Sequence, residues 1–139
     1  MESIAVIFWS GTGNTATMAQ EVVAGTGGQA KLINVTDTNA DEAAAYDKLA
    51  LGCPSMGDEV LEEDEMEPFI TALEGKISGK KVVLFGSYDW GDGQWMRDWA
   101  ERTKKAGAIL AADPLIVNLS PDADGKAKCR ELGKALADA

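Results

Sequence analysis

Residues 4–15 have the sequence IAVIFWSGTGNT, and this stretch decides the fold. Six apolar residues in a row, 4–9, are typical of a strand buried on both faces in the middle of a parallel sheet. A loop with two glycines follows, and a helix over Thr15–Ala24 comes directly after it. A buried strand, a tight loop and a helix form the opening unit of an α/β domain.

The same alternation continues to the end of the chain. The further strands are expected at Lys31–Val35, Lys48–Gly52, Lys81–Gly86 and Ile109–Leu119, the last interrupted by Pro114. The further helices are expected at Asp41–Asp47, Glu65–Glu74, Gln94–Ala106 and Gly125–Ala137. Five strands alternating with helices predict one domain, residues 1–139, with a parallel sheet covered on both faces. Ligands bind outside the carboxyl ends of such strands, so the loops after the first, third and fourth strands should carry the function.

The composition limits the chemistry. The chain has no His, which excludes His-based catalysis and the usual zinc ligands. Its two cysteines, Cys53 and Cys129, are too few for a disulfide framework or an iron–sulfur motif. We therefore expect no metal site, and an organic cofactor for any redox work. The first apolar run is too short for a bilayer and no basic segment precedes it, so we expect a cytoplasmic protein without membrane contact.

The charge is negative and unevenly placed. The formal net charge is −10, and residues 1–75 hold only 2 of the 13 basic residues but 14 of the 23 acidic ones. A phosphate backbone would be repelled, so we expect no nucleic-acid partner. The acidic half favours the docking of a basic protein partner. The alternative interpretation is that the charge only maintains solubility.

The first loop has the residues to hold an anion. Its members are Ser10, Gly11, Thr12, Gly13, Asn14 and Thr15. The helix N-terminus presents free N–H groups, four side chains add donors, and no Lys or Arg is present, which predicts phosphate binding by neutral hydrogen bonds. The spacing also matches a dinucleotide fingerprint, but the hydroxyls better suit the three oxygens of a terminal phosphate. A helix cap alone would explain one or two of these residues.

The loop after the third strand offers groups for a flat ring. Met56 gives a soft apolar contact, Gly57 allows a turn with positive φ, and Glu59 can accept a hydrogen bond from a ring imide N–H. Ser55 and Asp58 complete this candidate segment. Taken by itself, the loop is better explained as a surface turn that leads into a solvated acidic helix. The acidic run at 62–67 is expected to be a solvated or partner-facing surface, since its carboxylates lack the spacing of metal ligands.

The loop after the fourth strand places aromatic residues among glycines. Its candidate residues are Ser87, Tyr88, Asp89, Trp90 and Gly91. Tyr88 or Trp90 is expected to stack on a planar ligand. Trp95 and Trp99, four residues apart on the next helix, are expected to fill the core instead. A phosphate pocket, a flat slot and polar groups for a ring edge together predict FMN as the ligand.

Six motifs in order give the chain its resemblance to a known family. They are W-S-G-T-G-N-T at 9–15, M-G-D-E-x-L-E at 56–62, E-P-F at 67–69, G-K-K-V at 79–82, L-F-G-S-Y at 84–88 and W-G-D-G-x-W-M-R at 90–97. Over its whole length the chain resembles the flavodoxins, in particular the short-chain type of anaerobic bacteria such as clostridia and Megasphaera. The resemblance implies a three-layer sandwich with a five-stranded parallel sheet in the order 2-1-3-4-5.

The resemblance also implies a function. The chain would be a low-potential one-electron carrier with non-covalent FMN, using its semiquinone/hydroquinone couple. It would turn over no substrate of its own. We expect a monomer whose acidic face around the flavin edge docks the redox proteins that reduce or oxidise it.

Particular residues receive roles from the same resemblance. The phosphate would be held by Ser10, Thr12, Asn14 and Thr15 with the loop amides. Met56 would cover the inner face of the flavin and Trp90 the outer face, while Glu59 would bond its N3–H. The Gly57 carbonyl would turn toward N5 when the ring takes up its first electron and a proton. The pyrimidine oxygen and N1 would lie near the backbone of Ser87–Gly91.

One departure and two alternatives accompany this interpretation. Position 89 is Asp, where close family members usually have Gly, and this adds a carboxylate near the ring. An FMN-dependent NAD(P)H quinone or nitro reductase is possible on the same fold, but little sequence is left to build a substrate pocket. A signalling receiver domain would want acidic residues after the first strand, where this chain has the Ser/Thr/Asn loop.

Overall fold

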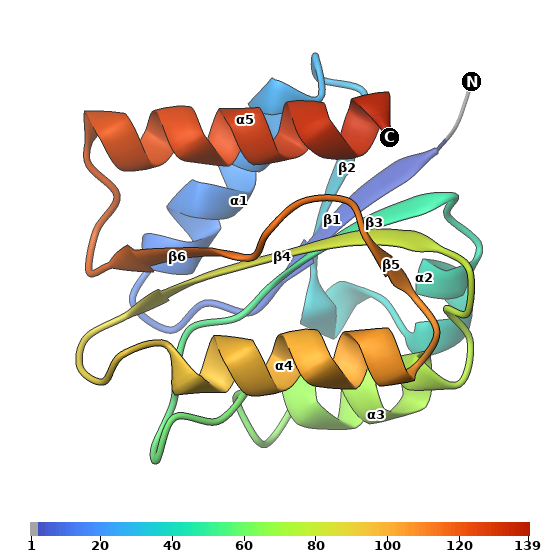
Figure 1. The fold of residues 1–139 in the computed structure, drawn as a ribbon, viewed down its shortest axis with the longest axis horizontal. Helices are drawn as coiled ribbons and strands as arrows, with labels where there is room; N and C mark the ends of the chain where they lie inside the picture. The colour runs from blue at the N-terminus through green and yellow to red at the C-terminus, as the bar shows by residue number, and fades with distance from the viewer. Residues whose placement is uncertain (1–2) are drawn as a thin grey trace.

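The computed structural model describes residues 3–139 as alternating strands and helices (Figure 1). The strands are β1 (Ile4–Phe8), β2 (Lys31–Asn34), β3 (Lys48–Gly52), β4 (Lys81–Tyr88), β5 (Ile109–Leu110) and β6 (Leu115–Asn118). The helices are α1 (Asn14–Gly25), α2 (Ala40–Ala44), α3 (Met66–Glu74), α4 (Gln94–Lys105) and α5 (Ala123–Asp138), with a 3-10 turn η1 (Val35–Asp37) after β2. Every element expected from the sequence is present, and most ends agree within two residues.

The sheet has the expected order and direction. Its strands run β2-β1-β3-β4-β5, every pair is parallel, and β6 also pairs with β4. The expected single strand over 109–119 is two strands: β5 pairs with Lys81–Val82 and β6 with Phe85–Tyr88. Pro114 lies between them, and a proline has no N–H for the ladder. Pairing with β6 also extends β4 two residues beyond Gly86.

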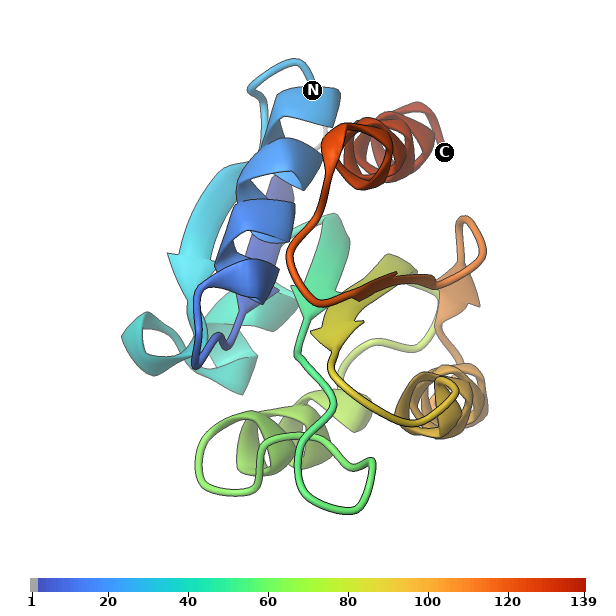
Figure 2. The same cartoon turned by 90° about the vertical axis from the view of Figure 1, so that its left-hand side faces the viewer.

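Helices cover both faces of the sheet in three layers. Helices α1 and α5 lie on one face, and α2, α3 and α4 lie on the other (Figures 1 and 2). All five residues of β1 are buried, as expected for a strand covered on both sides. Trp95 and Trp99 on α4 are each 1% exposed and belong to the hydrophobic core, which confirms them as core residues. No helix among residues 3–139 is both long and apolar enough to cross a membrane.

The layers bring three loops to one edge of the sheet. β1, β3 and β4 are parallel neighbours, so the loops that follow them leave the sheet at the same end. These loops lie on the left in Figure 1 and face the viewer in Figure 2. The edge at which the sequence predicts a ligand is therefore the edge at which its three candidate loops meet.

Candidate functional site

The loop after β1 gathers hydrogen-bond donors at the start of α1. Ser10 Oγ accepts from the amides of Gly13 and Ala16 at 3.1 and 3.2 Å, so two backbone N–H groups converge on one oxygen atom. Gly13 holds the turn with a φ of 100°. Among residues 3–139, the amides of Thr12 and Asn14 have no protein acceptor. The loop therefore presents the donor-rich helix terminus that binds anions.

Thr15 connects this loop to the end of β4. It is 1% exposed, and its Oγ1 lies 3.2 Å from Ser87 Oγ and accepts from the Ser87 amide at 3.4 Å. Ser87 is buried too, and its carbonyl accepts from the Ser55 amide at 3.0 Å. Three of the candidate residues thus form one hydrogen-bonded chain beneath the site, which links the start of α1, the end of β4 and the loop after β3.

The loop after β3 is a tight turn closed by two hydrogen bonds. The amides and carbonyls of Met56 and Val60 are mutually bonded at 2.9 Å, as an isolated antiparallel bridge. Gly57 has a φ of 51°, the positive value that the sequence predicts. Glu59 also has a positive φ, 58°, which is uncommon for a residue with a side chain. Gly57 and Asp58 are exposed at the tip, whereas Met56 and Glu59 are half-buried.

Glu59 joins the loop after β3 to the loop after β4. Its Oε1 accepts from the Asp92 amide at 3.1 Å. The same oxygen lies over Gly91, where a Cβ atom would stand only 1.9 Å away. Arg97 holds Asp92 from the other side, with Nη1 on its carbonyl at 3.0 Å and Nη2 on its carboxylate at 2.9 Å. Among residues 3–139, no hydrogen bond joins the loops at 10–15 and 54–64 directly.

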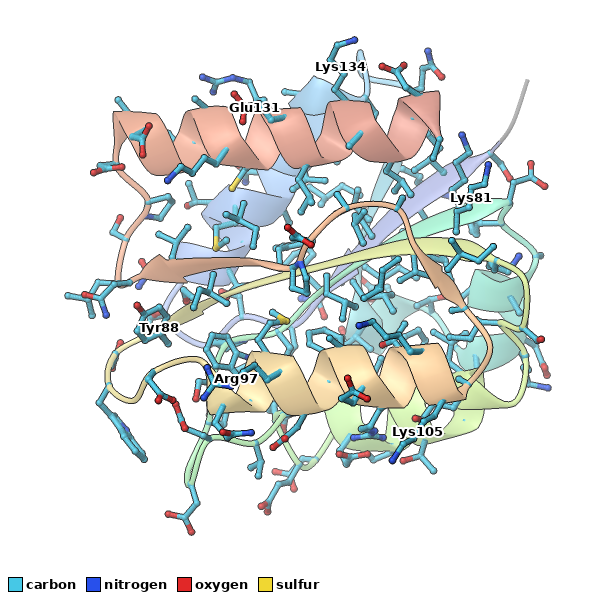
Figure 3. The ribbon with its side chains drawn as sticks, in the orientation of Figure 1. Lys81, Tyr88, Arg97, Lys105, Glu131 and Lys134 are labelled. Carbon is cyan, nitrogen blue, oxygen red and sulfur yellow. The ribbon has the colours of Figure 1, made fainter. Side chains whose placement is uncertain are left out.

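The aromatic residues of the loop after β4 differ in exposure. Trp90 is 60% exposed, so its indole is available to another molecule. Tyr88 is half-buried, and its ring centroid lies 5.7 Å from that of Trp95 with a tilt of 48°. Figure 3 shows Tyr88 and Arg97 at the end of the molecule where β4 stops. The Trp90 ring is thus the exposed one of the two aromatic rings in this loop, whereas the Tyr88 ring packs toward the core.

Two residues that sequence reasoning missed, at the end of β6 and directly after it, form hydrogen bonds with this loop. The Asn118 side chain donates to the carbonyls of Tyr88 and Asp89 at 3.1 and 3.4 Å, and the Leu119 amide donates to Tyr88 at 2.8 Å. Leu119 has a φ of 59° and is 51% exposed. An exposed leucine at the end of an edge strand carries no local sequence signal, and only the pairing of β6 with β4 brings it to the site.

Glu62 corrects the expectation of a uniformly solvated acidic surface. It is 6% exposed and accepts from the amides of Asp64, Glu65 and Met66, each at 2.8 Å. Three amides at the start of α3 satisfy this carboxylate, as in a helix cap. Glu63, Asp64 and Glu65 are exposed, as expected.

Glu67, the last carboxylate of the run, is part of an ion-pair cluster. Arg102 on α4 contacts both of its oxygens, at 2.7 and 2.8 Å, and also contacts Glu74 at 2.9 Å. Hydrogen bonding to Arg102 lowers the pKa of Glu67 below its ordinary value. The cluster ties α3 to α4 and is a structural feature rather than a docking surface.

The remaining reactive groups do not form a second site. Burial raises the pKa of the Cys53 thiol to about 12 and that of Cys129 to about 11, so both are unreactive thiols at neutral pH. Residues 3–139 contain no group of three or more potential metal ligands. A cavity of about 370 Å³ between α4 and β6 is lined by residues that include Arg97 and Lys104. Gly93 is its only lining residue from the candidate loops. The donors and the exposed ring lie at the loops, not in this cavity.

Comparison with known proteins decides the family. The family model described as Flavodoxin matches residues 6–133. The flavodoxin of Clostridium beijerinckii is 52% identical over 136 residues, which cover 96% of this chain and 98% of the relative. The flavodoxin of Megasphaera elsdenii is 46% identical over 139 residues, which cover 98% and 99% of the two chains. This chain belongs to the flavodoxin family.

Solved flavodoxins share the fold as well as the sequence. The solution structure of two-electron reduced Megasphaera elsdenii flavodoxin has a TM-score of 0.88 and 44% identity, covering 98% of this chain and 99% of that one. The expected fold, a flavodoxin-like sandwich of the short-chain type, is thereby confirmed. As a flavodoxin, the chain binds FMN and carries electrons between redox partners.

The residues present fit FMN. The loop at 10–15 supplies amides and hydroxyls without any Lys or Arg, which suits a phosphate bound by neutral donors. Trp90 offers an exposed aromatic face and Met56 a soft apolar contact from the neighbouring loop. Glu59 supplies a carboxylate acceptor between the two loops. In this flavodoxin these groups would suit the phosphate, the two ring faces and the imide N–H of the cofactor.

Proposed function

We propose that the three loops hold FMN through the residues that the sequence singles out. The phosphate would be held by Ser10, Thr12, Asn14 and Thr15 with the loop amides, of which those of Gly11, Thr12 and Asn14 have no protein acceptor among residues 3–139. Met56 and Trp90 would cover the two faces of the ring, and Glu59 would accept from its imide N–H. Ser55, Gly57, Asp58 and the backbone of 87–91 complete the site. Bound FMN supplies one-electron chemistry, and the protein binds, orients and covers it.

The hydrogen-bonded junction beneath the loops carries this proposal. Ser87 contacts both Thr15 and Ser55, and Glu59 reaches Asp92, so the three loops are mutually fixed. A rigid junction at the carboxyl edge of β1, β3 and β4 holds donors and an aromatic ring in place before the cofactor arrives. The structure thereby supports a site whose binding groups need little rearrangement.

The Thr12 hydroxyl provides a direct test of the phosphate assignment. It has no protein partner among residues 3–139, so Thr12→Val removes a donor at no cost to the fold. A hydrogen bond to a charged group contributes about 1.5–3 kcal/mol. Thr12→Val should therefore weaken FMN binding by about tenfold or more and leave riboflavin binding unchanged. Both affinities are measured by quenching of flavin fluorescence in the apoprotein.

A matched control for Thr12→Val lies at the other end of the sheet. Ser78 is an exposed hydroxyl residue in the turn before β4, and Ser78→Ala should leave both flavins unaffected. An equal loss of FMN and riboflavin affinity in Thr12→Val would show that the first loop does not hold the phosphate.

We propose that redox proteins dock on the acidic surface around the three loops. Asp58, Asp64, Asp89 and Asp92 are exposed on or beside these loops. Lys81 and Lys105 lie toward the opposite end in Figure 3, and Arg97, the labelled cation nearest the loops, is paired with Asp92 at 2.9 Å. Such an asymmetry orients an approaching basic partner and raises the association rate.

Salt dependence tests this docking surface. The probe is mitochondrial cytochrome c, a basic haem protein, reduced by the fully reduced holoprotein in a stopped-flow instrument. The double variant Asp58→Asn/Asp64→Asn should slow the reaction several-fold at low salt and flatten its dependence on ionic strength. Glu131→Gln, which removes a carboxylate from α5, should change neither (Figure 3). Identical salt profiles for the double variant and the unmodified protein would contradict the assignment.

We further propose that the chain is a cytoplasmic monomer that turns over no substrate of its own. Two unpaired buried cysteines are ordinary in a reducing compartment. Sedimentation should give a single species near 14.7 kDa. The holoprotein should oxidise NADH and NADPH at only a background rate with quinone or nitroaromatic acceptors until a reductase is added. Rapid oxidation without a reductase would favour the FMN-dependent quinone or nitro reductase instead.

A further inference from the structure

The backbone after β4 has two neighbouring amides without a protein acceptor. Among residues 3–139, no protein group accepts from the N–H of Asp89 or of Trp90. The two carbonyls that precede these amides, those of Tyr88 and Asp89, both accept hydrogen bonds. The Asn118 side chain donates to the carbonyl of Tyr88 at 3.1 Å and to that of Asp89 at 3.4 Å.

Peptide geometry fixes where these two amides point. In a planar trans peptide the C=O and the following N–H point in opposite directions, and residues 3–139 contain no cis peptide. The Tyr88 carbonyl faces β6, where it also accepts from the Leu119 amide at 2.8 Å. The Asp89 amide therefore points away from β6. The same argument applied to the Asp89 carbonyl turns the Trp90 amide away from Asn118.

Asn118 interrupts the pattern in which successive carbonyls of a strand point to opposite sides. Along β4 the Ser87 carbonyl faces β3, where it accepts from Ser55, and the Tyr88 carbonyl faces β6. A continued strand would return the Asp89 carbonyl to the β3 side. The Asn118 amide holds it on the β6 side instead, so two consecutive N–H groups point away from β6 and Asn118. Successive N–H groups that point the same way form a concave site for an acceptor.

We propose that Asn118 is a positioning residue of the flavin site. By holding the carbonyls of Tyr88 and Asp89, it aims the amides of Asp89 and Trp90 at the acceptor edge of the pyrimidine ring of the flavin. This inference rests on the FMN site proposed above and adds a residue from β6 to it. Among residues 3–139, Asn118 has no hydrogen bond to the loop at 10–15, and it acts through the backbone of 88–90.

Two variants of Asn118 test the proposal. Asn118→Ala removes both hydrogen bonds, and Asn118→Asp replaces the donor with a carboxylate that faces two carbonyl oxygens. FMN and riboflavin carry the same ring, so Asn118→Ala should weaken both by the same factor, about fivefold to tenfold. Asn118→Asp should weaken both further. Flavin-fluorescence titration of each apoprotein gives the four affinities.

A matched control separates positioning from stability. Asn39 caps α2, where its side chain accepts from the Glu42 amide at 2.9 Å, and α2 lies across the molecule from the loop after β4 in Figure 1. Asn39→Ala should lower the melting temperature of the apoprotein at least as much as Asn118→Ala and leave both flavin affinities unchanged. Backbone ¹⁵N–¹H spectra should show the Asp89 and Trp90 amides shifted in the Asn118 variants and unmoved in Asn39→Ala.

The outcomes distinguish this proposal from the one on which it rests. Flavin affinities within twofold of the unmodified protein in both Asn118 variants would overturn the role of Asn118, whatever Thr12→Val does. A loss in Asn118→Ala confined to FMN would overturn it as well, since it would assign the residue to the phosphate. Failure of the unmodified apoprotein to bind FMN would overturn the proposed site itself.

Discussion

The Glu59 carboxylate accepts a hydrogen bond from the Asp92 amide at 3.1 Å, and this contact is the side-chain tie between the loop after β3 and the loop after β4. The contact depends on Gly91, whose missing Cβ leaves the space that Glu59 Oε1 occupies. Glu59 itself has a positive φ, so its backbone is also held in a costly conformation. The Glu59 carboxylate is the acceptor proposed for the flavin imide. Contacts with neighbouring residues therefore hold it in position, although its own backbone conformation is unfavourable.

Gly91→Ala should displace Glu59 from this position. The new Cβ would stand 1.9 Å from Glu59 Oε1, and the φ of 88° at residue 91 is unfavourable for alanine. We expect the apoprotein to lose about 1–3 kcal/mol of stability and FMN binding to weaken. Chemical denaturation and flavin titration measure the two effects. Gly75→Ala is the control, because residue 75 has a φ of −78° and open space around it, and it should not destabilise.

Leu119→Asn should stabilise the protein. Leu119 has a φ of 59°, a left-handed conformation that Asn adopts more readily than Leu, and its side chain is 51% exposed. The relief of backbone strain should exceed the small loss of apolar burial, for a gain of up to about 1 kcal/mol. The control is Leu32→Asn, at an exposed leucine in β2 with negative φ, which should destabilise. A lower melting temperature for Leu119→Asn than for the unmodified protein would disprove the strain argument.

Gly57→Thr should lower the first one-electron potential. The family resemblance implies that the peptide after Gly57 reorients on the first electron, and a β-branched side chain restricts that turn. A cost of about 1 kcal/mol corresponds to roughly 40 mV for one electron. Spectroelectrochemistry measures the shift. Gly79→Thr is matched to it, because both glycines have positive φ and open surroundings, and it should cost stability without moving either potential.

Asp89→Gly should raise the second one-electron potential at low salt. Asp89 is an exposed carboxylate in the loop that carries Trp90. A unit charge about 10 Å away at an effective dielectric of roughly 40 repels added negative charge by ~0.8 kcal/mol, or about 35 mV. The shift should shrink as salt screens the charge. Asp138→Gly, at the far end of α5, should give no shift, and a change below about 10 mV in Asp89→Gly would show that solvent screens Asp89 fully.

Glu67→Gln should change how stability depends on pH. Hydrogen bonding to Arg102 lowers the pKa of Glu67 in the folded protein below its ordinary value of 4.5. A lowered folded pKa contributes stability above the unfolded pKa and loses it as pH falls through the folded pKa. The variant should thus be less stable at pH 7, by about 1 kcal/mol, with a difference that shrinks below about pH 4.5. Urea denaturation from pH 7 to pH 3 tests this, with Glu131→Gln as the exposed control.

Periodicity and glycine placement made most of the fold predictable. The buried run at 4–9, the Gly-rich loop and the regular alternation fix the order of elements, and parallel topology then fixes the edge that holds the loops. The split of the last strand at Pro114 was visible as an interruption but not as two separate pairings with β4. How a strand pairs depends on the residues of its neighbouring strand, so the sequence of one segment alone does not predict the pairing.

The site was predictable where chemistry is local and not where it depends on packing. The donors at 10–15 and Trp90 are recognisable from residue type, because hydroxyls and an exposed indole bind in characteristic ways. Glu62 was mistaken for surface, since only the start of α3 shows that its carboxylate faces three amides. Asn118 was missed because its partners lie about 30 residues away, on β4.

The interrupted last strand makes the segment 111–114 a natural point for grafting. β5 and β6 each keep their own register against β4, through Lys81–Val82 and Phe85–Tyr88. Extra residues inserted between them would lengthen a connection without shifting either register, at an entropic cost that grows only slowly with loop length. A reporter peptide or a recognition loop could thus be added at this edge of the sheet while the three loops that serve the flavin stay as they are.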